Sequence, residues 1–295
     1  SYGLLIRRSR VRAPEGPHIF LASTSYVLRM DTGFTDPQAI AVAFGLTLLA
    51  GLSTGLGGVI VALKRQPGHR FLAGSLGFSA GVMVYISFVE LLPEGILSLG
   101  EAGIGRAEMA GTAAFFAGIA LIALIDRFVP EDINPHEEPH ALDSSRMRSV
   151  GFLTALAIAI HNFPEGFATF ISALADPALG VPIAVAIAIH NIPEGVAVAV
   201  PLRQASGDRW RAAGWATLSG LTEPLGAVAG YLVLRPFLGP ATLGYCFAAI
   251  AGVMVFVSLD KLLPTAVQTG RHHAAVYGLV AGMAVMAVSL LLLPG

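Results

Sequence analysis

The sequence predicts an all-α polytopic membrane protein, a single bundle of eight transmembrane helices with both chain termini extracytoplasmic. Its 295 residues are 55% hydrophobic and only 13% charged, which is too apolar for a soluble globule of this length. A helix that crosses a ~30 Å hydrocarbon layer needs about 20 residues. Eight apolar segments meet this length: 37–63, 71–98, 107–129, 149–173, 178–202, 210–234, 237–263 and 274–294.

The distribution of Lys and Arg orients these helices, because basic residues accumulate in the cytoplasmic loops of membrane proteins. The connections after the second, fourth and sixth segments hold only Arg106 and Arg235. The connections after the odd-numbered segments hold many more: Lys64, Arg65, Arg70, Arg127, Arg146, Arg148, Arg203, Arg209, Arg211, Lys261 and Arg271. The odd-numbered helices are therefore expected to end in the cytoplasm, and residues 130–148 are expected to form a cytoplasmic loop.

The first 29 residues do not follow this rule. They carry five arginines on the side that should be poor in them: Arg7, Arg8, Arg10, Arg12 and Arg29. The apolar stretch 19–28 is too short for a secretory signal core, and Met30 stands just before the first apolar segment. We expect residues 1–29 to be a disordered upstream extension without function, and residues 30–295 to form one membrane domain.

A hexapeptide occurs twice inside apolar segments, as His161-Asn162-Phe163-Pro164-Glu165-Gly166 and as His190-Asn191-Ile192-Pro193-Glu194-Gly195. Ionisable residues within a membrane helix are costly and usually mark an ion or substrate path. At 3.6 residues per turn, the His, Asn and Glu of each copy share one narrow face. Each proline removes a backbone donor, so each helix is expected to kink and to expose a carbonyl beside the polar cluster.

The spacing of the two copies places them in the membrane. They lie symmetrically about residue 178, so each is about 15 Å from the turn of a helical hairpin, or half of a ~30 Å core. In an antiparallel pair, Glu165 is then level with His190, and His161 with Glu194. Glu223 in segment 210–234 is expected at a similar depth.

Three carboxylates at this depth, with no Lys or Arg beside them in the sequence, must take up protons or bind cations. With two imidazoles and two amide oxygens, they offer enough ligands for two divalent metals that share carboxylates. Imidazole and carboxylate ligands suit Zn²⁺ and related first-row ions. The single cysteine, Cys246, provides no thiolate cluster, which argues against Cu(I).

Other acidic residues outline a path through the bundle. Glu90 and Glu94 are expected at the outer mouth, and Asp260 at the cytoplasmic end, near the point where Asp126 emerges. Each of these four can equally be an ordinary charge at headgroup level.

The predicted cytoplasmic loop contains two histidines. His136 and His140 frame an acidic stretch that suits metal capture, although a plain solvated turn explains it equally well.

Other function classes fit less well. Within the eight apolar segments there is neither the His-Glu-x-x-His of zinc proteases nor the Glu-x-x-His of di-iron carboxylate enzymes. A proton or sodium antiporter uses buried carboxylates but has no need for paired His-Asn. The chain also has no P-loop for ATP. Transport of a divalent metal without ATP is therefore favoured over both a membrane metalloenzyme and an antiporter.

The two motifs, the Glu223-Pro224 pair and the eight spans resemble the Zrt/Irt-like protein (ZIP) family of divalent metal transporters over roughly residues 37–295, and its bacterial zinc-uptake branch in particular. The resemblance implies a binuclear metal site. The first metal would take His161, Glu165, His190 and Glu194, with Met83 nearby. The second would take Asn162, Glu165, Asn191, Glu194 and Glu223. Glu90 matches a position that often carries a ligand, whereas Lys261 stands where the family often has an acid.

The resemblance also implies a function. The protein would move Zn²⁺, and also Fe²⁺, Mn²⁺, Co²⁺ and Cd²⁺, across a bacterial inner membrane into the cytoplasm. It would be no enzyme and would use no catalytic cofactor. Its partners would be divalent metals and the lipid bilayer, with no nucleic acid, and a homodimer is left open. The first, fourth, fifth and sixth helices would move as a block against the other four.

Overall fold

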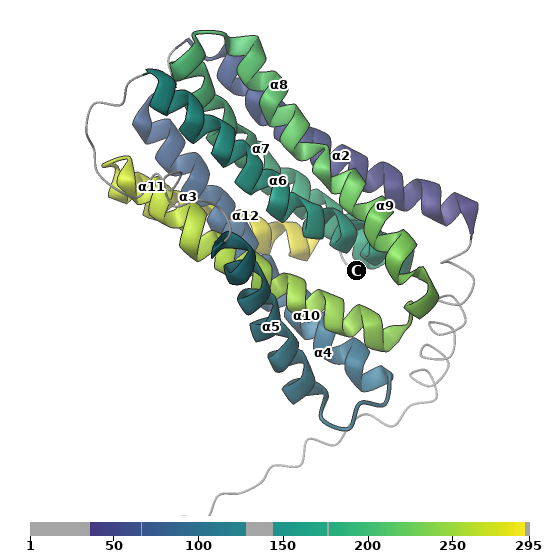
Figure 1. The fold of residues 1–295 in the computed structure, drawn as a ribbon. Helices are drawn as coiled ribbons and strands as arrows, with labels where there is room; N and C mark the ends of the chain where they lie inside the picture. Colours follow the sequence, from purple (N-terminus) through teal and green to yellow (C-terminus); the bar gives the residue numbers. More distant parts are fainter. Residues whose placement is uncertain (1–35, 66, 128–143, 176, 293–295) are drawn as a thin grey trace, which may run out of the picture.

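The computed structural model describes residues 36–65, 67–127, 144–175 and 177–292, and every regular element in these ranges is a helix (Figure 1). The elements are α2 Pro37–Leu63, α3 His69–Ile86, η1 Ser87–Leu91, α4 Leu92–Glu101, α5 Ala107–Arg127, α6 Ser144–Ala175, α7 Pro177–Ser206, α8 Arg209–Gly220, α9 Thr222–Leu234, η3 Arg235–Phe237, α10 Pro240–Val257, η4 Ser258–Leu262, α11 Leu263–Gln268 and α12 His272–Leu292. The predicted extension 1–29 lies outside the described residues.

The helices confirm a polytopic membrane protein. Within the described ranges, six are long and apolar enough to cross a membrane: Pro37–Leu63, His69–Glu101, Ala107–Arg127, Gly180–Ser206, Pro240–Gln268 and His272–Leu292. The predicted sixth span is divided at Leu221 into α8 and α9, of 12 and 13 residues, and neither alone reaches the length of a span. The number of eight spans and the side of each terminus stay predictions.

The fourth predicted segment is longer than expected. Helix α6 begins at Ser144, so the last part of the predicted loop 130–148 is helical. The sequence Ser-Ser-Arg-Met-Arg contains neither Pro nor Gly, so nothing in it stops a helix from continuing into water beyond the apolar residues. Residues 128–143 lie outside the described part of the chain.

Two segments contain a wide helical turn that the sequence analysis did not predict. In η1 and η4 the backbone N–H of Leu92 bonds to the carbonyl of Ser87, and that of Leu263 to Ser258, which is the i to i+5 pattern of a π-helix. Each turn precedes a Leu-Pro pair. The surrounding sequences are similar, with Gly-Val-Met-Val at 81–84 and again at 252–255. The two long helices α3–η1–α4 and α10–η4–α11 are thus built alike.

The helices form two blocks. The first block contains α2, α6, α7, α8 and α9, and the second contains α3, α4, α5, α10, α11 and α12. The main contact between the blocks is α3 against α7, with smaller contacts of α10 with α6 and of α12 with α7. This grouping is the one that the family resemblance implied.

Glycines allow the helices within each block to pack at backbone distance. In the first block, Gly195 of α7 lies against the backbone of Thr54 in α2, and Gly166 of α6 lies against the backbone of Glu223 in α9. In the second, Gly77 of α3 lies against Ala275 of α12, and a side chain at any of these positions would collide with the neighbouring backbone. Each block is therefore tightly packed internally.

Candidate metal site

Polar side chains gather in the middle of the first block, where an apolar core would be expected. Six are at most 1% exposed: Asn162 and Glu165 on α6, His190, Asn191 and Glu194 on α7, and Glu223 on α9. Among the described buried residues there is no Lys or Arg. The carboxylates of this group, which we call the central cluster, thus have no buried Lys or Arg to balance them.

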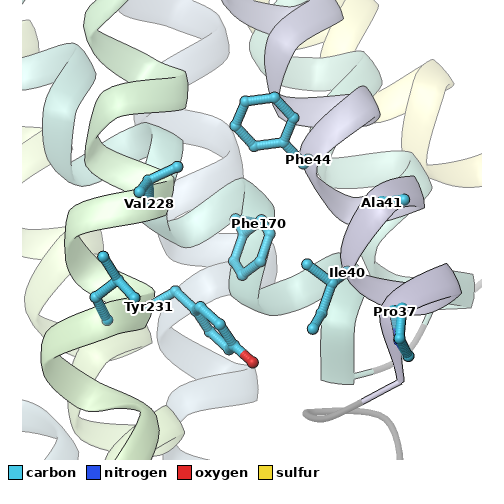
Figure 2. A pocket seen from close by; sticks show the side chains of 8 residues that line it. Pro37, Ile40, Ala41, Phe44, Phe170, Val228 and Tyr231 are labelled. Atoms are coloured by element: carbon cyan, nitrogen blue, oxygen red, sulfur yellow. The ribbon is translucent and has the colours of Figure 1, made fainter.

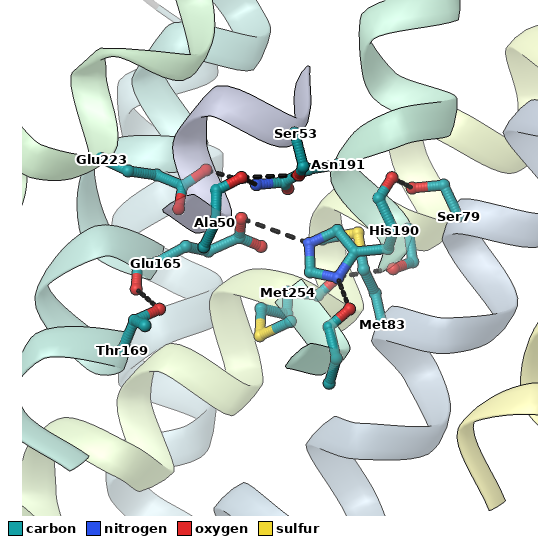
Figure 3. Close-up of polar contacts among 12 residues, drawn as sticks. Ala50, Ser53, Ser79, Met83, Glu165, Thr169, His190, Asn191, Glu223 and Met254 are labelled. Atoms are coloured by element: carbon teal, nitrogen blue, oxygen red, sulfur yellow. Dashed lines mark hydrogen bonds and ion pairs between the residues drawn. The ribbon is translucent and has the colours of Figure 1, made fainter. Parts of the chain in front are cut away.

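Three members of the central cluster come close enough to share one ion. Glu165, His190 and Glu194 each offer a ligand atom, and these atoms lie within 4.8 Å of one another. Figure 3 shows the His190 ring pointing from α7 towards the Glu165 carboxylate of α6. Glu165 and His190 thus lie side by side on neighbouring helices, as the spacing of the two motifs predicted.

The hydrogen bonds of His190 identify the ring nitrogen that carries the proton. Nδ1 lies 3.2 Å from the carbonyl oxygen of Ala186, which can only accept, so Nδ1 carries the proton. In the neutral ring, Nε2 then presents a lone pair at 3.4 Å from Oε2 of Glu165. Two lone pairs that face each other in a buried site require a cation or a proton between them. A backbone carbonyl that fixes the tautomer is the usual support of a metal-binding histidine.

The other side of the central cluster joins three helices. Asn191 Nδ2 donates to the carbonyl of Ala50 in α2 at 2.9 Å and also to Oε1 of Glu223 (Figure 3). Asn191 Oδ1, Glu223 Oε2 and Glu165 Oε1 have no hydrogen-bond partner among the described residues. A buried oxygen without a partner costs about 1–3 kcal/mol, and three of them in one cluster provide a ready set of oxygen ligands for a second ion.

The break between α8 and α9 explains how Glu223 reaches this position. The helix stops at Leu221 and restarts at Thr222, so Glu223 lies in the first turn of α9, where the helix dipole favours a negative charge. Gly166 brings α6 against the Glu223 backbone. The carboxylate is therefore held beside α6 and α7 by backbone geometry.

The structure gives less detail for the two remaining residues of the first hexapeptide, His161 and Asn162. Asn162 is fully buried on α6, one residue after His161. The side chain of His161 lies outside the described part, although its backbone belongs to α6. The prolines 164 and 193 lie inside α6 and α7, which continue past them as helices.

Two methionines from the second block flank the central cluster, and the sequence analysis named only one. Ser79 of α3 donates to the backbone carbonyl of His190 at 3.3 Å, and Met83 follows one turn later, fully buried. Met254 of α10 is buried as well and appears with Met83 in Figure 3. The repeated Val-Met-Val at 82–84 and 253–255 was the signal that could have indicated Met254.

Known proteins match both the motifs and their context. The ZIP Zinc transporter family matches residues 130–290, more than half of the chain. The zinc transporter ZupT of Corynebacterium efficiens is 63% identical over 266 residues, which cover 87% of this chain and 99% of that protein. ZupT of Clostridium perfringens is 51% identical over 282 residues, and ZupT of Campylobacter jejuni 48% over 288, each covering 88% of this chain and 99% of the relative.

The chain belongs to the ZIP family. This is a family of transporters, which confirms the prediction that the protein is not an enzyme and confirms the resemblance to its bacterial, ZupT-like branch.

Two acids of this ZIP chain, Glu90 and Glu94, lie on the helix with the first π turn. Glu90 is part of η1 and half-buried, and Glu94 lies in the first turn of α4, where Ser98 Oγ donates to it at 3.5 Å. A π turn shifts the side chains that follow it and often occurs at functional sites. Their position at an outer mouth of the transporter stays a prediction.

The opposite end holds a second group of charges, which we call the end cluster. Lys261 Nζ lies 2.8 Å from Oδ2 of Asp126 and 3.2 Å from Oδ2 of Asp260. Asp126 and Asp260 are thus neighbours, as expected, but both are paired with Lys261.

The loop histidines His136 and His140 lie outside the described residues. The pentapeptide His136-Glu137-Glu138-Pro139-His140 has the order of the His-Glu-x-x-His zinc-protease motif, which the sequence analysis considered only in the membrane segments. Pro139 would interrupt the helix on which that motif depends. Membership of a transporter family argues against a protease here.

Proposed function

We propose that the protein takes up divalent metal ions, Zn²⁺ above all, through a binuclear site on α6, α7 and α9. The first metal would take His161, Glu165, His190 and Glu194. The second would take Asn162, Glu165, Asn191, Glu194 and Glu223. The observation that carries the proposal is the buried triad of Glu165, His190 and Glu194, whose ligand atoms lie within 4.8 Å of one another, where a metal ion can bind. The relatives named zinc transporters support it.

The ligand chemistry supports a range of ions. Nitrogen and carboxylate oxygen suit Zn²⁺ and also Fe²⁺, Mn²⁺ and Co²⁺. Met83 and Met254 add polarisable sulfur beside the site, which favours a soft ion such as Cd²⁺. The metal is the transported cargo, so we propose no catalytic cofactor.

The direction follows from the membrane potential. A divalent cation that moves inward through −100 mV gains about 4.6 kcal/mol, twice the ~2.3 kcal/mol of a single charge. We propose that the chain spans a bacterial inner membrane eight times with both termini outside, so that Glu90 and Glu94 face the incoming ion. The potential alone then drives uptake, without ATP.

Proteoliposomes test this proposal. Purified protein in vesicles with an inside-negative potential should take up ⁶⁵Zn²⁺ without ATP, and Co²⁺ or Cd²⁺ should compete. Glu165→Gln, a nearly isosteric change, should stop uptake while the protein still inserts. Uptake that requires ATP, or net outward flux under the same potential, would contradict the proposal. Proton flux that persists without any metal would instead support an antiporter.

A further inference from the structure

An apolar groove runs along the first block at one end of the bundle (Figure 2). It has a volume of about 430 Å³ and is lined by α2, α6 and α9. The residues that form it include Ile40, Phe44, Phe170, Val228, Tyr231 and Leu232. We call it the α2–α9 groove. None of the residues that line it belongs to the central cluster.

Water cannot fill this groove well. Its lining is apolar, and the Tyr231 hydroxyl is the one polar side-chain group among the residues that form it. A buried water needs two to four polar partners. An empty groove would lose the dispersion contacts of its lining, including those of Phe170 and Tyr231, whose rings pack edge to face at 5.4 Å. In a membrane protein, the medium that can fill it is hydrocarbon.

The groove lies at the level where hydrocarbon meets headgroups. Helix α2 begins at Pro37 and α9 ends at Leu234, so the groove lies at the ends of both helices. Tyr231 is a residue type enriched at this interface, with its ring in the apolar layer and its hydroxyl at the edge.

A cation stands at the mouth of the groove. The guanidinium of Arg235 lies 5.8 Å from the centroid of the Tyr231 ring, which lines the groove. Arg235 is exposed, and among the described residues it has no carboxylate partner. A guanidinium binds phosphate oxygens through paired charge-assisted hydrogen bonds.

We propose that the α2–α9 groove is a binding site for an anionic phospholipid, with one acyl chain in the groove and the phosphate on Arg235. The apolar lining selects the chain, and the unpaired guanidinium at the mouth selects the headgroup charge. The lipid would attach to the block that carries the metal ligands.

Native mass spectrometry of the full chain in detergent tests this site, with phosphatidylglycerol and phosphatidylcholine of the same acyl chains as probes. The unmodified protein should retain phosphatidylglycerol in preference. Arg235→Gln should weaken phosphatidylglycerol binding about fivefold, the effect of one basic residue at a membrane surface, and should remove the preference. Val228→Trp should fill the groove and reduce the binding of both lipids.

Two matched variants control for general effects. Arg106→Gln removes another exposed arginine, and Val280→Trp adds a ring to an exposed position on α12, outside the groove. Both should bind lipid as the unmodified protein does. Equal binding by Arg235→Gln and Arg106→Gln would overturn the proposal. A deletion of residues 1–29 gives a second outcome that would overturn the proposal. If the deletion increases lipid binding and Arg235→Gln does not reduce that binding, the chain's own segment is the occupant of the groove.

Discussion

The central cluster and the end cluster are both built from acids on neighbouring helices, yet they differ in what balances the charge. In the central cluster Glu165, Glu194 and Glu223 are at most 1% exposed, and there is no Lys or Arg among the described buried side chains. In the end cluster Asp126 and Asp260 are 30% and 45% exposed and share Lys261. Carboxylates thus form a candidate metal site where they are completely buried and where no Lys or Arg balances their charge.

The two clusters should therefore respond differently when a substitution removes one of their charges. At the central cluster, a Glu→Gln substitution removes a buried negative charge that a bound cation would otherwise balance. At the end cluster, the pair is partly exposed, and such pairs contribute about 0–1 kcal/mol. Five single substitutions, grouped in four predictions, test the contrast.

The largest effect is expected at the carboxylates shared by both metals. Glu165→Gln and Glu194→Gln should each abolish high-affinity zinc binding. Changes to the surroundings of a ligand already cost roughly 10–100-fold in affinity, and these changes remove the ligand itself. In the metal-free state the same variants should be at least as heat-stable as the unmodified protein. Calorimetric titration and thermal unfolding measure both; near-normal affinity in either variant would remove the shared-carboxylate assignment.

A smaller loss is expected at His190, which serves the first metal only. His190→Gln removes the Nε2 ligand and should abolish one of two bound zinc ions, with more than a hundredfold loss of affinity at that site. Metal content by elemental analysis, before and after dialysis, measures this. Two ions retained at unchanged affinity would show that imidazole is not a ligand.

Glu223→Gln should weaken the binding of the second metal only. The amide keeps an oxygen for the Asn191 side chain, so the fold should be preserved, whereas the negative ligand is gone. We expect one zinc ion to remain bound and the uptake rate to fall several-fold. Loss of both ions would mean that the two positions are not separable.

The smallest effect is expected at Lys261. Lys261→Gln leaves Asp126 and Asp260 without their shared cation and should lower the free energy of unfolding by about 0–1 kcal/mol. Zinc affinity of the central cluster should not change, and a weak additional zinc ion should bind at the end cluster. The double variant Lys261→Gln/Asp126→Asn is the control, because it should lose that additional ion. A large loss of central-cluster affinity would show that the two clusters are coupled.

Much of the fold and of the site could be predicted because they depend on local sequence. Apolar length identified the helical segments to within a few residues, as in 107–129 for α5. The spacing of the two hexapeptides placed Glu165 beside His190, since a hairpin of known rise leaves little freedom in the register. The family resemblance also implied that Lys261 stands where an acid is common, although not that it joins two carboxylates.

Other features depend on contacts between distant residues and could not be predicted in this way. The break at Leu221 is the exception, because Pro224 cannot donate to the carbonyl of Gly220 and so gives a local signal that the sequence analysis did not use. The π turns are recognised from backbone hydrogen bonds of the folded helices, which the sequence does not show. The groove exists only where α2, α6 and α9 meet.

The distribution of ligands over the two blocks has a kinetic consequence. In the proposed site the oxygen and nitrogen ligands come from α6, α7 and α9 of the first block, and the described residues of the second block place Met83 and Met254 beside them. If one block slides against the other, the ion keeps its coordination shell and only the route to it changes. Affinity would then be nearly the same from either side, and equal zinc concentrations across a membrane without potential would give rapid isotope exchange with no net flux.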